Sequence, residues 1–138
     1  MLITGRCHCG NIAFALDCQP EPSEIPARAC TCSFCAKHTA VWTSCPTGLL
    51  NVSVKDRDRV SRYAFGTKTA EFHVCTACDV VPVVTSRIDG RLYAVVSVNI
   101  ASSGLPRPPA VRRSADRVCL CALASVPPLL AVGGTLTL

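Results

Sequence analysis

Seven of the eleven cysteines in this chain fall into three short groups, and their spacing constrains the fold more than any other feature. The groups are a CxC at residues 7–9, a CxCxxC at residues 30–35 and a CxxC at residues 75–78. Two cysteines separated by one residue do not easily bond to each other, but a short turn can direct both at one ion. Metal binding is therefore the first hypothesis for these groups.

The cellular compartment decides between metal sites and disulfides, because eleven cysteines in 138 residues are compatible with both. Residues 1–17 show no basic segment followed by an apolar stretch, so no secretory signal is visible and a reducing cytoplasm is expected. Metal binding then outranks disulfide formation. The four cysteines outside the groups are expected to be small buried apolar side chains: Cys18, Cys45, Cys119 and Cys121.

Composition and pattern predict a small all-β fold. With 49% hydrophobic and 17% charged residues, the chain should form one compact domain. Glycine and asparagine at residues 9–11, and Asp89-Gly90, predict hairpin turns because these residues tolerate positive φ. Helix is expected only at residues 33–39, with Ser33 as the N-cap. Eight β-type runs predict short antiparallel strands: residues 3–9, 11–17, 40–45, 49–54, 61–65, 70–75, 80–86 and 91–98.

The chain divides into three predicted segments. Residues 1–100 form the zinc-binding β domain, and residues 101–117, rich in proline and arginine, form a linker or loop. Residues 118–138 are an uncharged C-terminal tail, predicted as a strand or two packed on the domain or as a poorly ordered end. A membrane span is not expected there, because Pro127-Pro128 and Gly133-Gly134 interrupt the apolar run.

Net charge gives little support for a nucleic-acid partner. The formal charge of +5 counts every cysteine as neutral, and seven thiolates holding two zinc ions would reduce it to about +2. The remaining basic excess lies mainly in residues 107–117. No basic face is evident in the body of the domain, so nucleic-acid binding is not expected.

The first and last cysteine groups together supply four sulfurs, enough for a closed tetrahedral zinc site. The predicted ligands are Cys7, Cys9, Cys75 and Cys78. A closed shell leaves no position for a substrate, so we expect this zinc to be structural and to tie residues 7–9 to residues 75–78. His8, inside the CxC turn, is expected to point away from the metal.

The middle group, Cys30, Cys32 and Cys35, supplies three sulfurs and no fourth. A zinc ion with three protein ligands keeps a position for water or substrate, and a thiol entering it would be held as thiolate. These cysteines are therefore expected to hold a metal that binds an external thiol. Two alternatives stay open: His38 completes a structural Cys₃His site, or one cysteine is itself a redox or nucleophilic group.

Three motifs in order give the chain a family resemblance. GxCHCGxIxF at residues 5–14, CxCSFCxKHxAxWT at 30–43 and YxFGTxTxEFHxCxxC at 63–78 resemble the glutathione-dependent formaldehyde-activating enzyme family, to which the zinc domain of centromere protein V is also similar. The resemblance covers about residues 4–100. It implies a β-tent fold with two zinc ions per chain, the four-cysteine site structural and the three-cysteine site catalytic.

The resemblance also implies a reaction. It is that of a carbon-sulfur lyase of the S-(hydroxymethyl)glutathione synthase type, in which a zinc-bound thiolate adds to formaldehyde. Two departures from the family pattern concern Asp79, where members usually have glycine, and Ala36-Lys37, where an arginine is common. The segment after residue 100 matches nothing associated with the family, which bears on substrate binding.

The expected partners are a small thiol such as glutathione and an aldehyde, with no membrane. Candidate substrate-binding residues are Phe34, Lys37, His38, Trp42 and His73. Of these, His73 is expected to be a cross-strand or pocket neighbour, and a catalytic base is the competing interpretation. The competing functions are a zinc-stabilised binding module without chemistry, for protein or nucleic acid, and an inactive relative with an altered tail.

Overall fold

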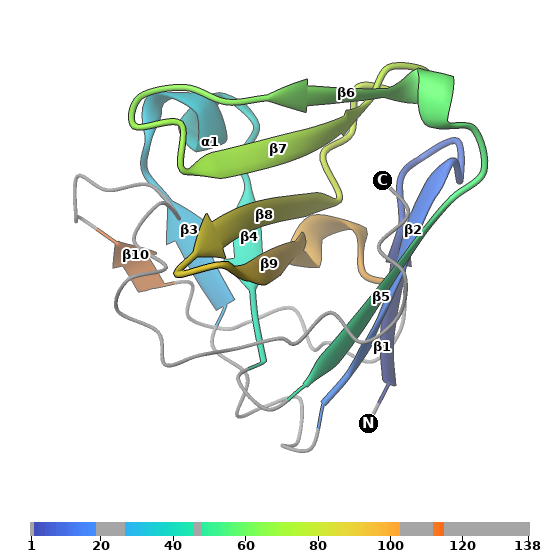
Figure 1. Cartoon of the computed structure of the whole chain (residues 1–138), viewed down its shortest axis with the longest axis horizontal. Coiled ribbons are helices and arrows are strands. Elements are labelled where there is room, and N and C mark those ends of the chain that lie inside the picture. The colour runs from blue at the N-terminus through green and yellow to red at the C-terminus, as the bar shows by residue number, and fades with distance from the viewer. Residues whose placement is uncertain (1, 19–26, 46–47, 103–111, 115–138) are drawn as a thin grey trace.

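The computed structural model describes residues 2–18, 27–45, 48–102 and 112–114. In these residues the chain forms two β-sheets that meet at an angle, with one short α-helix beside the larger sheet (Figure 1). The smaller sheet has the order β1-β2-β5, and the larger has the order β10-β3-β4-β9-β8-β7-β6. Every pairing is antiparallel except that of β10 with β3. The prediction of an all-β fold is confirmed.

The elements have the following bounds. The smaller sheet contains β1 (Leu2–Arg6), β2 (Ile12–Asp17) and β5 (Leu49–Val54). The larger contains β3 (Ala27–Cys30), β4 (Val41–Thr43), β6 (Val60–Tyr63), β7 (Ala70–Cys75), β8 (Val83–Ile88), β9 (Arg91–Ser97) and β10 (Arg112–Ser114). The helices are α1 (Ser33–Lys37) and the single 3₁₀ turns η2 (Arg57–Arg59) and η3 (Val98–Ile100).

Each of the eight predicted runs overlaps a strand, with ends that differ by up to three residues, and both predicted hairpin turns are present. Gly10 has φ 76°, and Asp89 and Gly90 have φ 50° and 77°. Two strands were not predicted. The β3 segment has a short sequence of low β propensity, and it forms because β4 pairs with it through Ala27↔Thr43. The β10 strand lies inside the segment predicted as a linker or loop.

The core is divided between the two faces of β8 and β9. On one face Val83, Ala94 and Val96 pack against Ile3 and other residues of the smaller sheet. On the other face Val84 and Val95 belong to a second cluster, which includes Cys35 of α1. Because side chains alternate along a strand, neighbouring residues of β8 and β9 serve different clusters. The larger sheet therefore separates the smaller sheet from α1.

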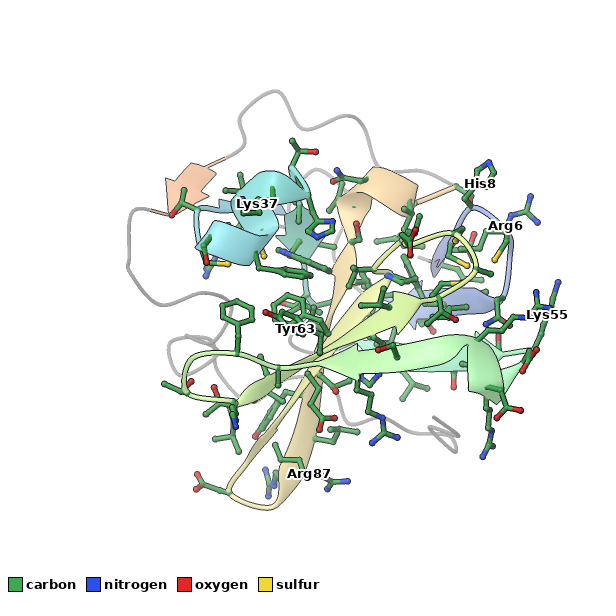
Figure 2. The ribbon with its side chains drawn as sticks, turned by 90° about the horizontal axis from the view of Figure 1, so that it is seen from above. Arg6, His8, Lys37, Lys55, Tyr63 and Arg87 are labelled. Atoms are coloured by element: carbon green, nitrogen blue, oxygen red, sulfur yellow. A yellow bond between two sulfur atoms is a disulfide. The ribbon has the colours of Figure 1, made fainter. Side chains whose placement is uncertain are left out.

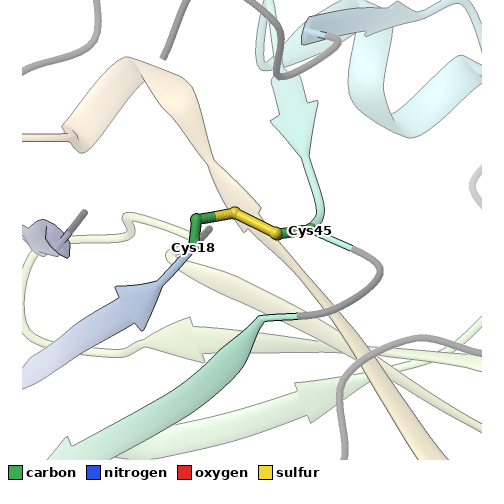
Figure 3. Close-up of a disulfide and its surroundings, with 2 residues drawn as sticks. All are labelled: Cys18 and Cys45. Carbon is green, nitrogen blue, oxygen red and sulfur yellow. A yellow bond between two sulfur atoms is a disulfide. The ribbon is translucent and has the colours of Figure 1, made fainter. Parts of the chain in front are cut away.

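A disulfide joins the two sheets, which corrects the prediction for two cysteines (Figure 3). Cys18, directly after β2, is bonded to Cys45, two residues after β4, with an S–S distance of 2.04 Å. Both are buried, as expected, but they are not separate thiols. Their sequence separation of 27 gave no signal, because the two strand ends meet only when the sheets pack. A disulfide is typical of oxidising surroundings, whereas the sequence predicts a reducing cytoplasm.

Replacing Cys18 with alanine should lower the free energy of unfolding by about 3 to 4 kcal/mol, the chain-entropy value for a loop of this length. Thermal unfolding of oxidised wild type and variant measures the difference, and a count of free thiols in freshly isolated protein establishes the state of the pair. The reduced wild type is the control. If its unfolding temperature equals that of the oxidised protein, the bond contributes no stability.

Two predicted segments fall largely outside the described residues. The first is the uncharged tail at residues 118–138, with Cys119 and Cys121, and the second is most of the linker at residues 101–117. Among the described residues, no helix has the length and apolar character needed to cross a membrane.

Candidate metal centres

The first and last cysteine groups meet at one point, where their four sulfur atoms lie within 4.8 Å of one another. The Sγ atoms of Cys7 and Cys9 are 3.6 Å apart, and those of Cys9 and Cys75 are 3.4 Å apart. A tetrahedral zinc ion with Zn–S bonds of about 2.3 Å needs sulfurs roughly 3.8 Å apart. The cluster, completed by Cys78, therefore fits such an ion with little adjustment. His8 is exposed and stays outside it.

Two turns present these sulfurs. In the first, the Gly10 N–H donates to the Cys7 carbonyl at 2.9 Å, and the Ile12 N–H donates to Cys7 Sγ at 3.3 Å. In the second, the Asp79 N–H donates to the Cys75 carbonyl at 2.7 Å. The two carbonyl contacts close the turns, whereas the Ile12 N–H is directed at a sulfur and stabilises the thiolate form that a metal requires. The hairpin tip and the CxxC turn are thus built as two halves of one site.

The thiols of the second turn differ in acidity. Burial raises the pKa of Cys75 to about 12. Burial also acts upward on Cys78, but hydrogen bonds from the backbone N–H groups of Cys9 and Val80, and from the neighbouring thiols, lower the pKa of Cys78 to about 6. Of the two thiols in this turn, Cys78 is therefore the more acidic. A divalent cation at the cluster would supply the positive charge that lets Cys75 ionise as well.

Asp79 occupies the left-handed conformation, with φ 58°. This conformation is expected, because the family that the chain resembles usually has glycine at this position. Aspartate tolerates this region at some cost, and glycine has no such cost. Asp79→Gly should therefore raise the free energy of unfolding by about 0.5 to 1 kcal/mol in the zinc-loaded protein. Chemical denaturation measures the change, with Asp79→Ala as the matched control. A stabilising effect of the alanine variant would contradict the backbone explanation.

The middle group forms a second cluster, in which the sulfurs of Cys30, Cys32 and Cys35 also lie within 4.8 Å of one another. Cys32 caps α1, because its Sγ accepts a hydrogen bond from the Cys35 N–H at 3.3 Å. The predicted N-cap, Ser33, is instead the first helical residue, so that prediction was wrong by one position. The Trp42 indole N–H donates to Cys35 Sγ at 3.4 Å. The helix and β4 thus hold two of the three sulfurs.

This second cluster can also hold a metal ion, and two of its three cysteines are partly accessible to solvent. Cys35 is buried, but Cys30 and Cys32 are half-buried. Within the described residues no histidine or acidic side chain joins the three sulfurs. The exposed ring of His38 lies instead against Phe34, with ring centroids 4.4 Å apart. The described residues therefore give no support to the alternative in which His38 completes the shell.

An aromatic group lies beside this cluster. The Phe34 ring contacts those of Phe72, Tyr63 and Phe65, at centroid distances of 4.6, 5.2 and 5.8 Å. Tyr63 is 45% exposed, so the group reaches the surface. Sequence reasoning did not select Tyr63 or Phe65. Tyr63 shares a face with Phe72 because the two residues are partners across the β6–β7 pair, and alternation within residues 61–65 does not contain that register.

The remaining predicted substrate residues lie in different places. Lys37 is exposed in the last turn of α1. Figure 2 shows it well apart from Arg87, which lies in β8. Trp42 is buried, with 2% exposure, and it contacts the cluster through the hydrogen bond to Cys35. His73 is not brought together with the others. It follows Phe72 in β7 and so points to the opposite face of the sheet, where its Nε2 lies 2.7 Å from Thr85 Oγ1. Burial, together with nearby Arg62, lowers the pKa of His73 to about 4.

The fold and the two clusters define a small all-β protein with two cysteine sites suited to metal ions. The chain belongs to the glutathione-dependent formaldehyde-activating enzyme family, whose model matches residues 2–113. The family assignment made from the three motifs is thereby confirmed, and the match extends past residue 100.

A solved structure supports the same fold. The crystal structure of a Rhodobacter sphaeroides protein is similar to this chain at 26% sequence identity, with a TM-score of 0.63. The alignment covers 80% of this chain and 99% of the other. No curated protein matches the chain.

Proposed function

We propose that this protein is a zinc-dependent carbon-sulfur lyase that joins a small aldehyde, formaldehyde above all, to a thiol such as glutathione. One observation carries the proposal: in the described residues three sulfurs converge at a partly exposed position, separate from the group of four. Cys30, Cys32 and Cys35 would hold the catalytic zinc ion. The four-cysteine group would hold the structural one. The family supports both substrates.

The reaction is an addition whose atoms balance without a further reactant. The sulfur of the thiol forms a bond to the carbonyl carbon, the carbon-oxygen π bond breaks, and the thiol proton ends on the oxygen. The product is an S-(hydroxymethyl) thioether, and the reverse reaction releases both partners. A zinc ion held by the three cysteines would lower the pKa of a thiol in its fourth position and act as a template.

The chain's own residues would bind and orient the substrates. The exposed ammonium of Lys37, in the last turn of α1 and two residues after Cys35, is suited to a carboxylate of the thiol substrate. The rings of Phe34 and His38 lie against each other in a tilted arrangement on α1, where they would limit the entry of water. Trp42 would act as a positioning residue, because its N–H fixes the orientation of Cys35.

Trp42→Phe should keep the packing of an aromatic ring against Phe72 but lose the hydrogen bond to Cys35 Sγ. We expect the affinity of the three-cysteine site for zinc to fall by about 10 to 100-fold, as for other groups that orient metal ligands. Competition with a chromogenic chelator measures both sites in one titration. The four-cysteine site is the internal control, and equal weakening of both sites would indicate general destabilisation instead.

Cobalt substitution tests the proposal itself. Co²⁺ at the three-cysteine site should change its visible absorption when glutathione is added, because the external sulfur enters the coordination shell. The same titration with Cys32→Ser isolates the four-cysteine site, whose spectrum should not respond. A wild-type spectrum that is indifferent to thiols would overturn the proposed chemistry. Formation of S-(hydroxymethyl)glutathione, followed by NMR with ¹³C-formaldehyde, then measures the activity.

A further inference from the structure

A cavity of about 550 Å³ opens over strands β6 to β9, and none of the cysteines described above lines it. Its walls carry three cationic side chains, Arg62, Lys68 and Arg87, and one carboxylate, Glu71. The volume lies within the range of small-molecule sites. The cavity is therefore large enough for a ligand of its own.

The strand register places this cavity on the sheet face opposite the three-cysteine site. Arg62 pairs with His73, and the next pair along β6 and β7, Tyr63 with Phe72, points the other way. Phe72 packs with Cys35, so the face of Tyr63 and Phe72 is the one that α1 covers. The face of Arg62 and His73 is thus separated from the proposed reaction by the thickness of the sheet.

The charge of the cavity favours an anion. Three cations face one carboxylate, and in the part of the chain that the structure describes no ion pair joins Arg62, Lys68 or Arg87 to an acidic side chain. Surface cations gathered around a concavity raise the local potential, and arginine binds carboxylate and phosphate groups in bidentate fashion. A ligand with two negative charges would balance the excess.

Two buried polar side chains line the same cavity. His73 and Thr85 are 1% and 3% exposed, and Nε2 of His73 lies 2.7 Å from Thr85 Oγ1. Nδ1 of His73 is a buried nitrogen without a hydrogen-bond partner among the described residues. Buried polar atoms of folded proteins are nearly always paired, so the unpaired nitrogen of a histidine that lines a cavity is a group that a ligand can satisfy.

We propose that this cavity is a second binding site, separate from the thiol site, for a small organic dianion with carboxylate or phosphate groups. Arg62 and Arg87 hold the anionic groups, Lys68 adds charge at the rim, and the His73–Thr85 pair forms hydrogen bonds with the polar body of the ligand. Glu71 accepts hydrogen bonds from its hydroxyl or amino groups.

Isothermal titration calorimetry on the zinc-loaded full chain tests the proposal with two probes, succinate and glycerol 3-phosphate. We expect saturable binding of at least one, weaker at high salt, and the pair of probes distinguishes carboxylate from phosphate ligands. Arg62→Gln combined with Arg87→Gln should weaken binding by at least about tenfold. Arg91→Gln is the matched control, because Arg91 belongs to the same β8–β9 hairpin and pairs with Ile88, on the other face.

Two further readouts locate the bound probe. The imidazole ¹⁵N signals of His73 should shift on saturation, and Cys32→Ser should bind the probe as the wild type does. The proposal is overturned if neither probe saturates, if the double variant binds like the wild type, if Arg91→Gln is weakened equally, or if Cys32→Ser abolishes binding.

Discussion

Replacing Cys78 with serine should unfold the domain at ordinary temperatures. Zinc binding to structural sites supplies roughly 10 to 16 kcal/mol of apparent free energy, comparable to the entire stability of a small domain. The loss of one sulfur from a four-sulfur shell removes a large part of it. In this chain the same cluster joins the tip of the β1–β2 hairpin to the end of β7, so both sheets lose their connection there.

Circular dichroism during heating, with zinc content measured on the same sample, checks this result. Chelation of the wild type by a strong zinc ligand should reproduce the effect of Cys78→Ser. Thr76→Ser, a change in the same turn that leaves all four sulfurs in place, is the matched control. A Cys78→Ser protein that keeps its unfolding temperature would show that the four-sulfur cluster has no structural role.

Cys32→Ser should have the opposite profile, with activity reduced at least about 100-fold and little loss of stability. The sulfur of Cys32 has two roles: it belongs to the three-sulfur cluster, and it caps α1 by accepting from the Cys35 N–H. Serine is a poor replacement for the first role and a good one for the second, because its hydroxyl is a preferred N-cap acceptor. The fold should therefore survive while the metal site fails.

Cys32→Ala separates the two roles, because alanine provides neither a ligand nor a cap. It should be as inactive as Cys32→Ser and less stable by about 1 kcal/mol. Formation of the hydroxymethyl adduct measures activity, and thermal unfolding measures stability. Equal thermal losses from Cys32→Ser and Cys78→Ser would contradict the division into a structural and a catalytic cluster.

Much of the fold was accessible from local sequence patterns. The hairpin turns at Gly10 and at Asp89-Gly90 follow from the backbone freedom of those residues, and the strands beside them follow from alternation. The β3 strand was not accessible, because it depends on pairing with β4 and not on its own propensity. The Cys18–Cys45 bond was missed for a related reason: it reports how two sheets pack, which no local pattern contains.

For the candidate sites, spacing identified which sulfurs belong together but not what surrounds them. The two clusters contain the predicted cysteines. The Trp42 N–H to Cys35 Sγ contact depends on the position of β4 beside α1, and the ring of Tyr63 reaches Phe34 only through the β6–β7 pairing. His73 illustrates the limit most clearly: one step along β7 from Phe72 moves a side chain to the other face of the sheet.

The β1–β2 hairpin is fastened at both of its ends. Its tip carries Cys7 and Cys9, which join the cluster with Cys75, and its base carries Cys18, bonded to Cys45. Peeling this hairpin away would require both fastenings to open, so two copies of the chain cannot easily exchange it. Partial opening of the smaller sheet and complete unfolding should then be a single event, with amide protons of β2 exchanging only when the whole molecule opens.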